Sequence, residues 1–470
     1  MQADIHTGVR PENFGGKRVA VGGAGISGVA AVNALLAAGA DVSVIDRKDS
    51  DALAALAERG VRVSVGDAVE FASDTTALVV SPGWRPENPV IGRALAAGIE
   101  VYSEPELAWR LRDDSAGTAA PWLAVTGTNG KTTAVTMLAS MLEAAGLSTR
   151  ACGNIGHPVI SSALGGDGRR YDVLAVELSS FQLHWSSRLA PSAGAILNLA
   201  DDHLDWHGGF DAYAAAKLAI WRGPGVAIGN ADDAGVAERL GEHSAPVRPV
   251  AFTLSEPSAG QLGVIDGVLV DRAFSTAGVE LASVVDVVPP GDHNVANALA
   301  AAALARAHGV PPDAVSRGLS GYTPQPHRNR TVAIHGGVRF VDDSKATNPH
   351  AAAASLTSYS RIVWIAGGQL KGVNVDDTVR AVADRLAGVV LLGVDRAEIA
   401  ASLARHAPQL PVVDIERSDA DAMADVVAAA VKLAQPGDVV LLAPAAASLD
   451  MFASYGARGN AFAAAVAELA

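Results

Sequence analysis

Short apolar runs alternate with longer alanine-rich stretches along the first part of the chain. An apolar run at residues 17–23 (KRVAVGG) precedes a helix-like stretch at 29–39, and a second apolar run follows at 41–46. Further apolar runs occur at 77–81 and 99–103. Strand-length runs that alternate with helix-length stretches are typical of a parallel sheet covered by helices. We therefore predict a parallel α/β domain in this part of the chain.

Two further blocks repeat the alternation. The second begins with the strand pattern WLAVTG at 122–127 and continues through apolar runs at 172–179 and 193–199. Nearly all-apolar strands are typical of the centre of a parallel sheet. The second block is therefore predicted to contain a parallel sheet. The third block has the same alternating pattern and is also predicted to be α/β. Its apolar runs lie at residues 339–344, 361–368, 388–394, 410–415 and 438–444.

A chain of 470 residues is too long for one ordinary hydrophobic core. A polar, small-residue stretch at 112–121 is typical of a linker, and two prolines within 322–328 interrupt regular structure. We predict three α/β domains. They are a Rossmann-like domain at 1–116, a central P-loop ATPase-like domain with a parallel sheet at 117–325, and a Rossmann-like domain at 326–470.

Composition narrows the classes of protein that remain. Hydrophobic residues make up 49% and charged residues 18%, which is a globular composition. The 36 Lys and Arg against 50 Asp and Glu give a net charge of −14, which argues against binding to nucleic acid or to an anionic membrane. The single cysteine, Cys152, cannot form an internal disulfide and is interpreted as a small buried residue. No apolar run reaches about 18 residues and no secretory signal is found, so we predict a cytoplasmic protein without a membrane span.

The strongest local signal is GTNGKTT at residues 127–133, between a predicted strand and a predicted helix. In that context the backbone N–H groups and the helix dipole point at phosphates, and Lys131 neutralises their charge. Val125 stands where the longer Walker pattern has its first glycine, so the loop is the shorter GxxGK[ST] variety. The alternative is a glycine-bearing turn with a surface lysine.

Another glycine loop lies earlier in the chain and is called the first glycine loop below. It carries Gly23, Gly25 and Gly28 and follows the first predicted strand, and Asp46 ends the second strand. This spacing fits the dinucleotide fingerprint, in which the acidic residue meets a ribose. The pattern alone indicates a nucleotide-like anion at a helix N-terminus and does not identify it. Tight packing of a strand against a helix is the alternative.

Carboxylates gather after two predicted strands of the central block. Glu177 ends the apolar run at 172–177, at the strand end where ligand sites of α/β proteins collect. The segment at 200–207 carries a dense polar cluster after another apolar run. Metal binding and a solvated turn remain equally open for it, because Mg²⁺ prefers oxygen ligands over imidazole. The cluster consists of Asp201, Asp202, His203, Asp205 and His207.

Taken together, these strings resemble the Mur ligase family over nearly the whole chain, and most closely its members that add D-glutamate. The phosphate loop is shared with folate polyglutamate synthases. The strings ELSSFQL and DDSKATN, and the string that begins at Ser448, better distinguish the members that add D-glutamate. The resemblance rests on GTNGKTT (127–133), GNIG (153–156), ELSSFQL (177–183), DDHLDWH (201–207), AAKL (215–218), HNVAN (293–297), PHR (326–328), DDSKATNPH (342–350), GGQLKG (367–372) and SLDMFASYGARGNAF (448–462).

The resemblance implies ATP and two Mg²⁺ ions as cofactors. The catalytic residues that it implies are Lys131, Lys217, His203 and Arg328. The implied ATP contacts are Gly127, Thr128, Asn129, Gly130, Lys131, Thr132, Thr133, Asn294, Asn297, Arg328 and Asp343. The implied metal ligands are Thr132, Glu177, His203 and a carbamylated Lys217. Without the carbamate, Lys217 would be an ordinary residue on a helix surface.

The resemblance also implies two substrate sites. A UDP-linked substrate would contact Ile26, Ser27, Asp46, Arg47, Gly83, Asn154 and Ser179, so the N-terminal domain would bind UDP. D-Glutamate would contact Thr347, Lys371, Ser448, Leu449 and Tyr455 in the C-terminal domain. Two features depart from the family pattern, because Tyr455 stands where Phe is expected and APAAAS at 443–448 lacks the expected Ser and Cys.

The activity implied is an ATP-dependent ligase that joins D-glutamate to UDP-N-acetylmuramoyl-L-alanine through an acyl phosphate in peptidoglycan precursor synthesis. We expect a monomer whose partners are these small substrates. An L-alanine-adding ligase of the family and a folate polyglutamate synthase are the alternatives within the superfamily. An NAD(P)-binding oxidoreductase is a third alternative, which rests on the first glycine loop alone and leaves GTNGKTT unexplained.

Overall fold

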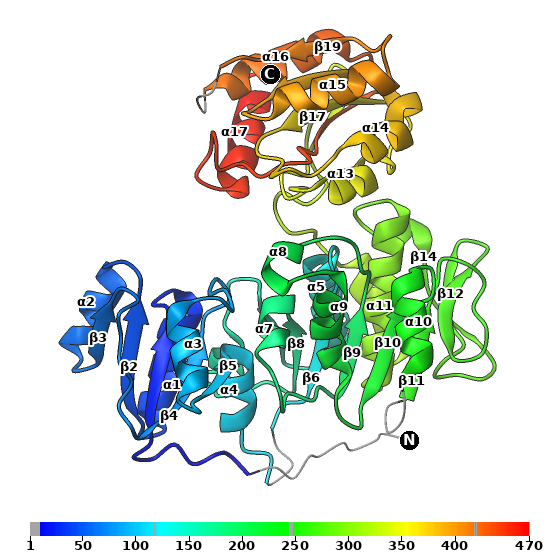
Figure 1. Cartoon of the computed structure of the whole chain (residues 1–470). Coiled ribbons are helices and arrows are strands. Elements are labelled where there is room, and N and C mark those ends of the chain that lie inside the picture. The colour runs from blue at the N-terminus through cyan, green and yellow to red at the C-terminus, as the bar shows by residue number, and fades with distance from the viewer. Residues whose placement is uncertain (1–9, 116–118, 244–247, 418, 420, 470) are drawn as a thin grey trace. The chain divides into compact units, whose positions relative to one another are not determined.

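The computed structural model describes residues 10–115, 119–243, 248–417, 419 and 421–469. The chain forms two compact units. The first holds the residues up to Asp286 together with Ala296–Tyr322, and the second holds Val287–Val295 with the residues from Thr323 onward. The first unit contains two sheets and the second contains one (Figure 1).

The first sheet is parallel, with strand order β3-β2-β1-β4-β5. Its strands are β1 (Arg18–Gly22), β2 (Asp41–Asp46), β3 (Arg62–Val65), β4 (Thr75–Val80) and β5 (Glu100–Ser103). The connecting helices are α1 (Ile26–Ala37), α2 (Asp51–Glu58), α3 (Pro89–Ala96) and α4 (Glu104–Leu111). Because β1 pairs with both β2 and β4, the order reverses at β1, and this reversal opens a crevice at the carboxyl ends of the strands.

The central sheet has nine strands in the order β14-β13-β12-β11-β10-β9-β6-β8-β7. They are β6 (Trp122–Thr126), β7 (Thr149–Gly153), β8 (Val173–Glu177), β9 (Ala193–Ile196), β10 (Val226–Asn230), β11 (Arg248–Phe252), β12 (Gln261–Ile265), β13 (Val268–Asp271) and β14 (Val279–Ser283). The strands from β7 to β12 are parallel, as predicted, but β13 and β14 add an antiparallel edge that the apolar pattern did not indicate.

Helices cover the central sheet, and its core residues are buried. All five residues of β6 are buried, and residues 298–305 of α11 are fully buried as well. A helix that is apolar on every side is typical of a position inside a domain. The helical elements are α5 (Lys131–Ala144), α6 (Val159–Ala163), α7 (Ser180–His184), α8 (Leu204–His207), α9 (Phe210–Leu218), η1 (Ala219–Trp221), α10 (Ala234–Glu242), η2 (Val284–Asp286), α11 (Asp292–Ala307) and α12 (Pro312–Ser320).

The second unit has a sheet of six strands in the order β15-β16-β20-β17-β18-β19, parallel except for the edge strand β15. The strands are β15 (Arg330–His335), β16 (Val338–Asp342), β17 (Ile362–Gly367), β18 (Leu386–Leu392), β19 (Val412–Asp414) and β20 (Val439–Leu442). The helices are α13 (Pro349–Leu356), α14 (Asp376–Val382), η3 (Ala383–Arg385), α15 (Arg396–His406), α16 (Ala422–Leu433) and α17 (Tyr455–Ala467). One hydrophobic cluster fills each face of this sheet.

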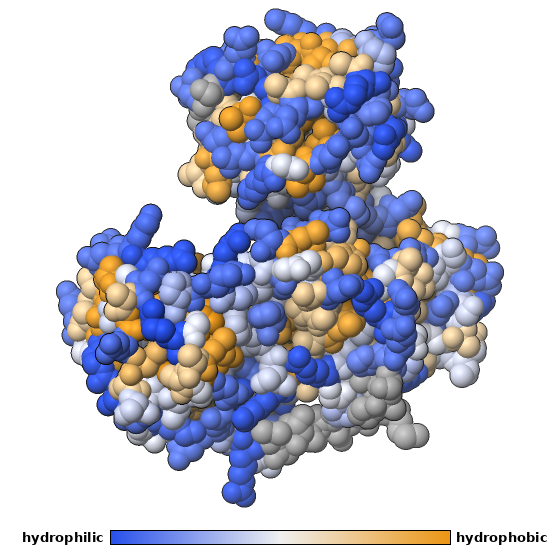
Figure 2. All heavy atoms as spheres, in the orientation of Figure 1, coloured by the Kyte–Doolittle hydropathy of each residue, from blue (hydrophilic) through white to orange (hydrophobic). Residues whose placement is uncertain are grey.

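The helices present polar faces to the surface. In Figure 2 hydrophilic residues interrupt the apolar ones over both units, as expected for helices that bury one face against a sheet. Among the helices of the described residues, none has the length and apolar content needed to cross a lipid bilayer.

A buried carboxyl group lies where α4 meets the central sheet. Glu104 is 2% exposed, and its Oε1 accepts a hydrogen bond of 2.6 Å from the Ile160 N–H of α6. Its Oε2 is buried with no partner among the described residues. Burial raises the pKa of Glu104 from its ordinary 4.5 to about 7, because the charged form loses its water.

This pKa predicts how stability depends on pH. Since the pKa of Glu104 is higher in the folded state than in the unfolded state, its contribution to stability is complete below about pH 4.5 and is lost as pH rises through about 7. The free energy of unfolding of the Glu104→Gln variant, relative to that of the wild type, should therefore be about 2–3 kcal/mol higher at about pH 8 than at about pH 5. Urea denaturation at both pH values measures the free energies of unfolding. An equal difference between the two proteins at both pH values would contradict the prediction.

Candidate active site

The phosphate loop lies between the carboxyl end of β6 and the first turn of α5. Gly127 has φ +156° and Gly130 has φ +85°, backbone conformations that favour glycine. A Cβ at Gly130 would also lie 2.2 Å from Asn297 Oδ1. The loop therefore requires glycine at this position for two reasons, and it brings the predicted ATP contact Asn297 against the loop.

Lys131 begins α5 and folds back over the loop. Its Nζ donates to the carbonyl oxygens of Gly127 and Thr128, each at 2.8 Å. Two residues outside the predicted site support the loop. Asn198 accepts from the Asn129 N–H at 2.8 Å, and the Tyr213 hydroxyl lies 2.8 Å from Thr128 Oγ1. The alternative of a plain turn with a surface lysine does not fit this arrangement, because the ammonium faces the loop interior.

Glu177 joins two other predicted residues at the strand ends. Its carboxylate is 1% exposed and accepts from Thr132 Oγ1 at 2.6 Å and from Asn154 Nδ2 at 3.0 Å. The register of β6 with β8 places Val125 beside Glu177, so the phosphate loop and the carboxylate meet at one edge of the sheet. A hydroxyl and a carboxylate are oxygen donors, which fit the coordination preference of Mg²⁺.

Lys217 is buried, so it is not the helix-surface residue that would have been expected without a carbamate. It is 2% exposed, and its Nζ donates to the Gly127 carbonyl at 2.9 Å and to Thr126 Oγ1 at 3.5 Å. Burial lowers the pKa of Lys217 well below its ordinary value, and the positive charge of Lys131 lowers it further. Its ammonium also lies 4.6 Å from the centre of the Tyr213 ring.

His203 precedes α8 with φ 53°, a left-handed conformation that is uncommon for a residue with a side chain. Its ring lies 4.7 Å from that of Phe181, and its Nε2 lies 3.4 Å from Asp202 Oδ2. Burial lowers the pKa of His203. The described residues contain no group of three or more His, Cys, Asp or Glu that could hold a metal. A self-contained metal site in the segment 200–207 is therefore not found, and its side chains serve different contacts.

Two of those contacts show how the segment is divided. Asp205 pairs with Arg85, which follows β4 of the first sheet. His207 Nε2 lies 3.0 Å from Ser180 Oγ, and burial lowers the pKa of His207 to about 4. Neither residue lies with Glu177 in the group formed with Thr132 and Asn154.

Ser179 has a local structural role. Its hydroxyl accepts from the Gln182 N–H at 3.2 Å and the Gln182 side chain accepts from the Ser179 N–H at 2.9 Å, which forms a capping box on α7. The predicted contact of Ser179 with a substrate stays a prediction.

The first glycine loop lies at the crevice of the first sheet. Asp46 Oδ2 accepts from the Ala24 N–H at 2.7 Å, so this carboxylate holds the loop. A Cβ on Gly28 would lie 1.8 Å from the Gly23 carbonyl oxygen, so tight packing of the helix on the loop is also real. Gly83 follows the neighbouring strand β4, and the side chains of Ile26 and Arg47 are exposed.

A cleft of about 550 Å³ adjoins this loop. Residues of the loop, of α1 and α2, and of the start of α6 line it, so it joins the first and central sheets. The lining consists of Ala24, Gly25, Ile26, Val29, Ala30, Asn33, Ala52, Pro158 and Ser161.

In the second unit, strained backbone surrounds Arg328. His327 and Asn329 have φ 62° and 49°, and the Asn329 N–H donates to Asp343 Oδ1 at 3.1 Å. Burial raises the pKa of Asp343 to about 6. His327 Nδ1 lies 2.6 Å from Asp342 Oδ2, a contact that the sequence did not indicate. The predicted ATP contact Asn294 is buried in this unit, with its Nδ2 3.5 Å from the Pro290 carbonyl.

Four of the predicted D-glutamate contacts lie on loops that follow strands of the third sheet, and the fifth, Tyr455, begins α17. An isolated bridge pairs Gln369 with Ala447, so the loop of Lys371 runs beside the loop of Ser448. Lys371 is exposed with φ 56°. Ser448 is buried, whereas Thr347 is half-buried and Leu449 and Tyr455 are exposed.

Arg458 holds these loops together and was not among the predicted site residues. This side chain is 1% exposed and donates to the carbonyl oxygens of Ser344 at 2.9 Å, Ala446 at 3.1 Å and Gly367 at 3.3 Å. In the sequence, Arg458 lies within the string SLDMFASYGARGNAF (448–462) that carries the resemblance, but nothing there indicates that its side chain is buried.

Comparison with protein families gives the class. Residues 17–103 match the model of the Mur ligase MurD-like N-terminal domain, residues 125–305 that of the Mur ligase middle domain, and residues 327–446 that of the Mur ligase glutamate ligase domain. The chain therefore belongs to the Mur ligase family. The predicted family and fold class are confirmed, whereas the domain boundaries stay predictions.

Individual relatives are more specific. The chain is 54% identical to the UDP-N-acetylmuramoylalanine–D-glutamate ligase of Thermobifida fusca, over 97% of this chain and 99% of that protein. It is 52% identical to the ligase of the same name from Streptomyces coelicolor, over 98% and 99%.

Solved structures show the same fold at low identity. The UDP-N-acetylmuramate-alanine ligase of Thermotoga maritima is 20% identical, with a TM-score of 0.58 over 97% of this chain and all of that one (100%). A bifunctional folylpolyglutamate synthase/dihydrofolate synthase is 19% identical, with a TM-score of 0.52 over 74% of this chain and 90% of that one.

The loop geometry predicts the effect of removing Lys131. Lys131→Ala should lower the rate of ATP-dependent turnover on the order of 10²-fold or more, because a fixed positive charge on a transferring phosphoryl group commonly contributes several kcal/mol. Steady-state phosphate release measures the rate, and circular dichroism checks that the variant is folded. Near-normal turnover in a folded variant would remove Lys131 from the mechanism.

Proposed function

We propose that this protein joins D-glutamate to UDP-N-acetylmuramoyl-L-alanine, coupled to the cleavage of ATP to ADP and phosphate, in peptidoglycan precursor synthesis. The observation that carries the proposal is identity of 50% or more, over nearly the full length, to several ligases named for this reaction. The grouping of Lys131, Thr132 and Glu177 at one strand edge supports the use of ATP. The oxidoreductase alternative has no support beyond the first glycine loop.

The first chemical step activates a poor electrophile. The alanyl carboxylate oxygen attacks the γ-phosphorus of ATP, ADP leaves, and an acyl phosphate forms. Lys131 moves from the loop carbonyls to the phosphates, where its charge offsets the charge of the transferring group. Arg328 of the second unit is proposed to act on the same phosphoryl group, since its guanidinium suits phosphate oxygens.

Magnesium fits the oxygen donors at the strand edge. We infer two ions: Thr132 and Glu177 would hold one, and His203 with the carbamate of Lys217 would hold the other. When bound, Mg²⁺ supplies positive charge that stabilises the phosphoryl group during its transfer. The chain's own part is to aim Glu177 with the hydrogen bonds from Thr132 and Asn154.

The second step forms the amide. The amine of D-glutamate attacks the acyl carbon, and phosphate leaves from the tetrahedral intermediate. D-Glutamate is proposed to be held by Thr347, Lys371, Ser448, Leu449 and Tyr455. The UDP end of the other substrate is proposed to be held by the first glycine loop with Asp46, Arg47 and Gly83. A monomer in the cytoplasm remains our prediction for its state and location.

Phosphate release from ATP tests the assignment. Purified protein is given ATP, Mg²⁺ and D-glutamate with UDP-N-acetylmuramoyl-L-alanine, a folate acceptor with L-glutamate, or no acceptor. Release with the first acceptor alone supports the proposal. Turnover of the folate, or of L-alanine on UDP-N-acetylmuramate, would move the chain to one of the alternatives within the superfamily.

The low pKa of Lys217 supports a carbamate, because only a neutral amine reacts with carbon dioxide and burial favours that form. Lys217→Ala should be nearly inactive, and a small carboxylate such as acetate should partly restore turnover by supplying the missing negative charge. Phosphate release with and without acetate measures both effects. A bare ammonium at Lys217 in a structure determined with bicarbonate and Mg²⁺ would contradict the carbamate.

Lys371 is proposed to meet only the incoming amino acid. Lys371→Ala should raise KM for D-glutamate roughly 10- to 150-fold, the loss of one charge-assisted contact, and leave KM for ATP unchanged. Lys432→Ala, which removes an exposed lysine of α16, is the matched control. L-Glutamate should remain a poor substrate of the wild type. Equal use of both enantiomers would show that the assignment within the family is wrong.

A further inference from the structure

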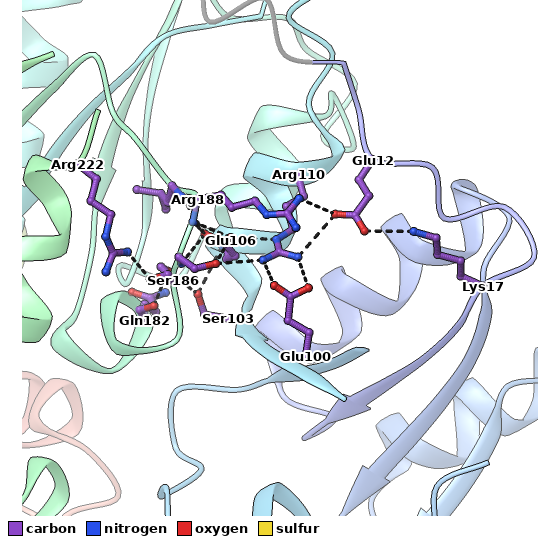
Figure 3. A network of polar contacts seen from close by, with 12 residues as sticks. Glu12, Lys17, Glu100, Ser103, Glu106, Arg110, Gln182, Ser186, Arg188 and Arg222 are labelled. Atoms are coloured by element: carbon purple, nitrogen blue, oxygen red, sulfur yellow. Dashed lines mark hydrogen bonds and ion pairs between the residues drawn. The ribbon is translucent and has the colours of Figure 1, made fainter. Parts of the chain in front are cut away.

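A buried carboxylate of α4 binds backbone of the central domain. The side chain of Glu106 is fully buried, and its oxygens accept from three successive N–H groups, those of Ser187, Arg188 and Leu189, at 3.0–3.2 Å. The Ser187 hydroxyl donates to it as well, at 3.3 Å. Figure 3 shows this carboxylate reaching from α4 into the loop that follows α7.

Arg110 balances the charge of Glu106. It lies one turn later on α4 and its Nε donates to Glu106 Oε1 at 2.9 Å. Its other nitrogens bind both oxygens of Glu100, at 2.8 and 2.6 Å, and one lies 3.6 Å from Glu12 (Figure 3). Glu12 also pairs with Arg188 at 3.4 Å. The carboxylate is therefore paired inside the first domain and hydrogen-bonded to the second.

Other contacts of the same turn cross the same boundary. The Ser103 N–H donates to the Trp185 carbonyl at 2.8 Å, and the hydroxyls of Ser103 and Ser186 lie 3.1 Å apart. Glu104 accepts from the Ile160 N–H, as described above. The first turn of α4 thus fixes two separate segments of the central domain.

Both segments lead directly to the candidate site. The loop held by Glu106 ends α7, which begins at Ser180, close after Glu177. The helix α6 held by Glu104 follows the loop of Asn154, whose amide binds Glu177. On its other side, α4 packs on the first sheet, whose β1 leads into the glycine loop. One short helical turn therefore links the glycine loop to the phosphate-transfer edge.

We propose that Glu106 is a positioning residue, which holds the glycine loop at a set distance from Glu177 and Lys131 so that one UDP-linked substrate reaches both. This inference rests on the proposed function. A ligand held at its two ends gains affinity from the second contact only when the two sites are correctly spaced. A buried ion pair adds little stability compared with apolar packing, so orientation accounts better than stability for a carboxylate at this position.

The test compares a bridging ligand with its parts. Glu106→Gln removes the charge and one of the two acceptor oxygens. The affinity for UDP-N-acetylmuramoyl-L-alanine should fall about tenfold, because the two ends of the ligand are no longer held in register. The affinities for UDP alone and for ADP alone should stay unchanged, since neither ligand spans the boundary between the first and central domains that Glu106 crosses. Isothermal titration calorimetry on the full chain measures all three.

Glu100→Gln is the matched control. Glu100 binds the same Arg110, and its hydrogen bonds among the described residues stay within the first domain, so this variant should bind all three ligands as the wild type does. An equal loss of affinity for UDP alone would overturn the proposal, as would an equal loss in Glu100→Gln or an unchanged affinity for the bridging ligand in Glu106→Gln. If Glu106→Gln does not fold, Glu106→Asp keeps the charge and withdraws the carboxylate from the loop.

A second measurement does not depend on the ligase activity. Spin labels at Glu58→Cys on α2 and Glu238→Cys on α10 report the distance between the two domains, because both positions are exposed and the natural Cys152 is buried. The distance distribution should be broader with Glu106→Gln than with Glu100→Gln, and equal widths would overturn the proposal. If the wild type does not use UDP-N-acetylmuramoyl-L-alanine, the proposed function fails while this measurement still decides the role of Glu106.

Discussion

Two lysine side chains share one carbonyl oxygen of the phosphate loop. Lys131 and Lys217 both donate to the Gly127 carbonyl, and Lys217 does so in a fully buried position. Like charges at this separation repel in a medium of low polarity, which is part of the reason that the pKa of Lys217 falls. Positive charge at the loop therefore favours the arrival of an anion. Bound phosphate groups or a carbamylated Lys217 would supply the negative charge.

The rest of the central domain places groups around these two lysines. The parallel register of β6, β8 and β7 brings the phosphate loop, Glu177 and Asn154 to one edge, although they lie far apart in the sequence. Glycines at 127, 130 and 153 let the backbone approach closely, since a Cβ at Gly153 would lie 2.1 Å from the Glu177 carbonyl oxygen. Left-handed backbone at His203, His327 and Lys371 lies in or beside the predicted sites, which agrees with the tendency of strained residues to occur where function constrains them.

The sequence could predict the features that depend only on residues close together in the chain. Apolar runs predicted β1, β2, β4, β5, β6, β8, β9 and the five parallel strands of the third sheet, but not β3, β7 or β10 to β15. The loop GTNGKTT with its flanking strand and helix predicted a phosphate site around Lys131. The antiparallel strands β13 and β14 were not predicted, because each is only four or five residues long and so short a run does not reveal its pairing direction. The burial of Lys217 could not be predicted either, since the alanines around it suit a buried and an exposed helix equally. Support from Asn198, Arg458 and Glu106 depends on contacts between distant segments, which one sequence does not reveal.

The alanine-rich helix α11 has a consequence for how the sequence can vary. Residues 298–305 are 0% exposed on every side, so the small methyl groups set how closely the surrounding strands and helices approach. A larger side chain anywhere in this stretch has no surface to escape to, and such overpacking commonly destabilises a core by about 1–3 kcal/mol. Random mutagenesis of the gene should therefore leave few surviving substitutions along this helix, fewer than around many residues that touch a substrate. Alanine here acts as a spacer, and intolerance to change at such positions reports packing and not chemistry.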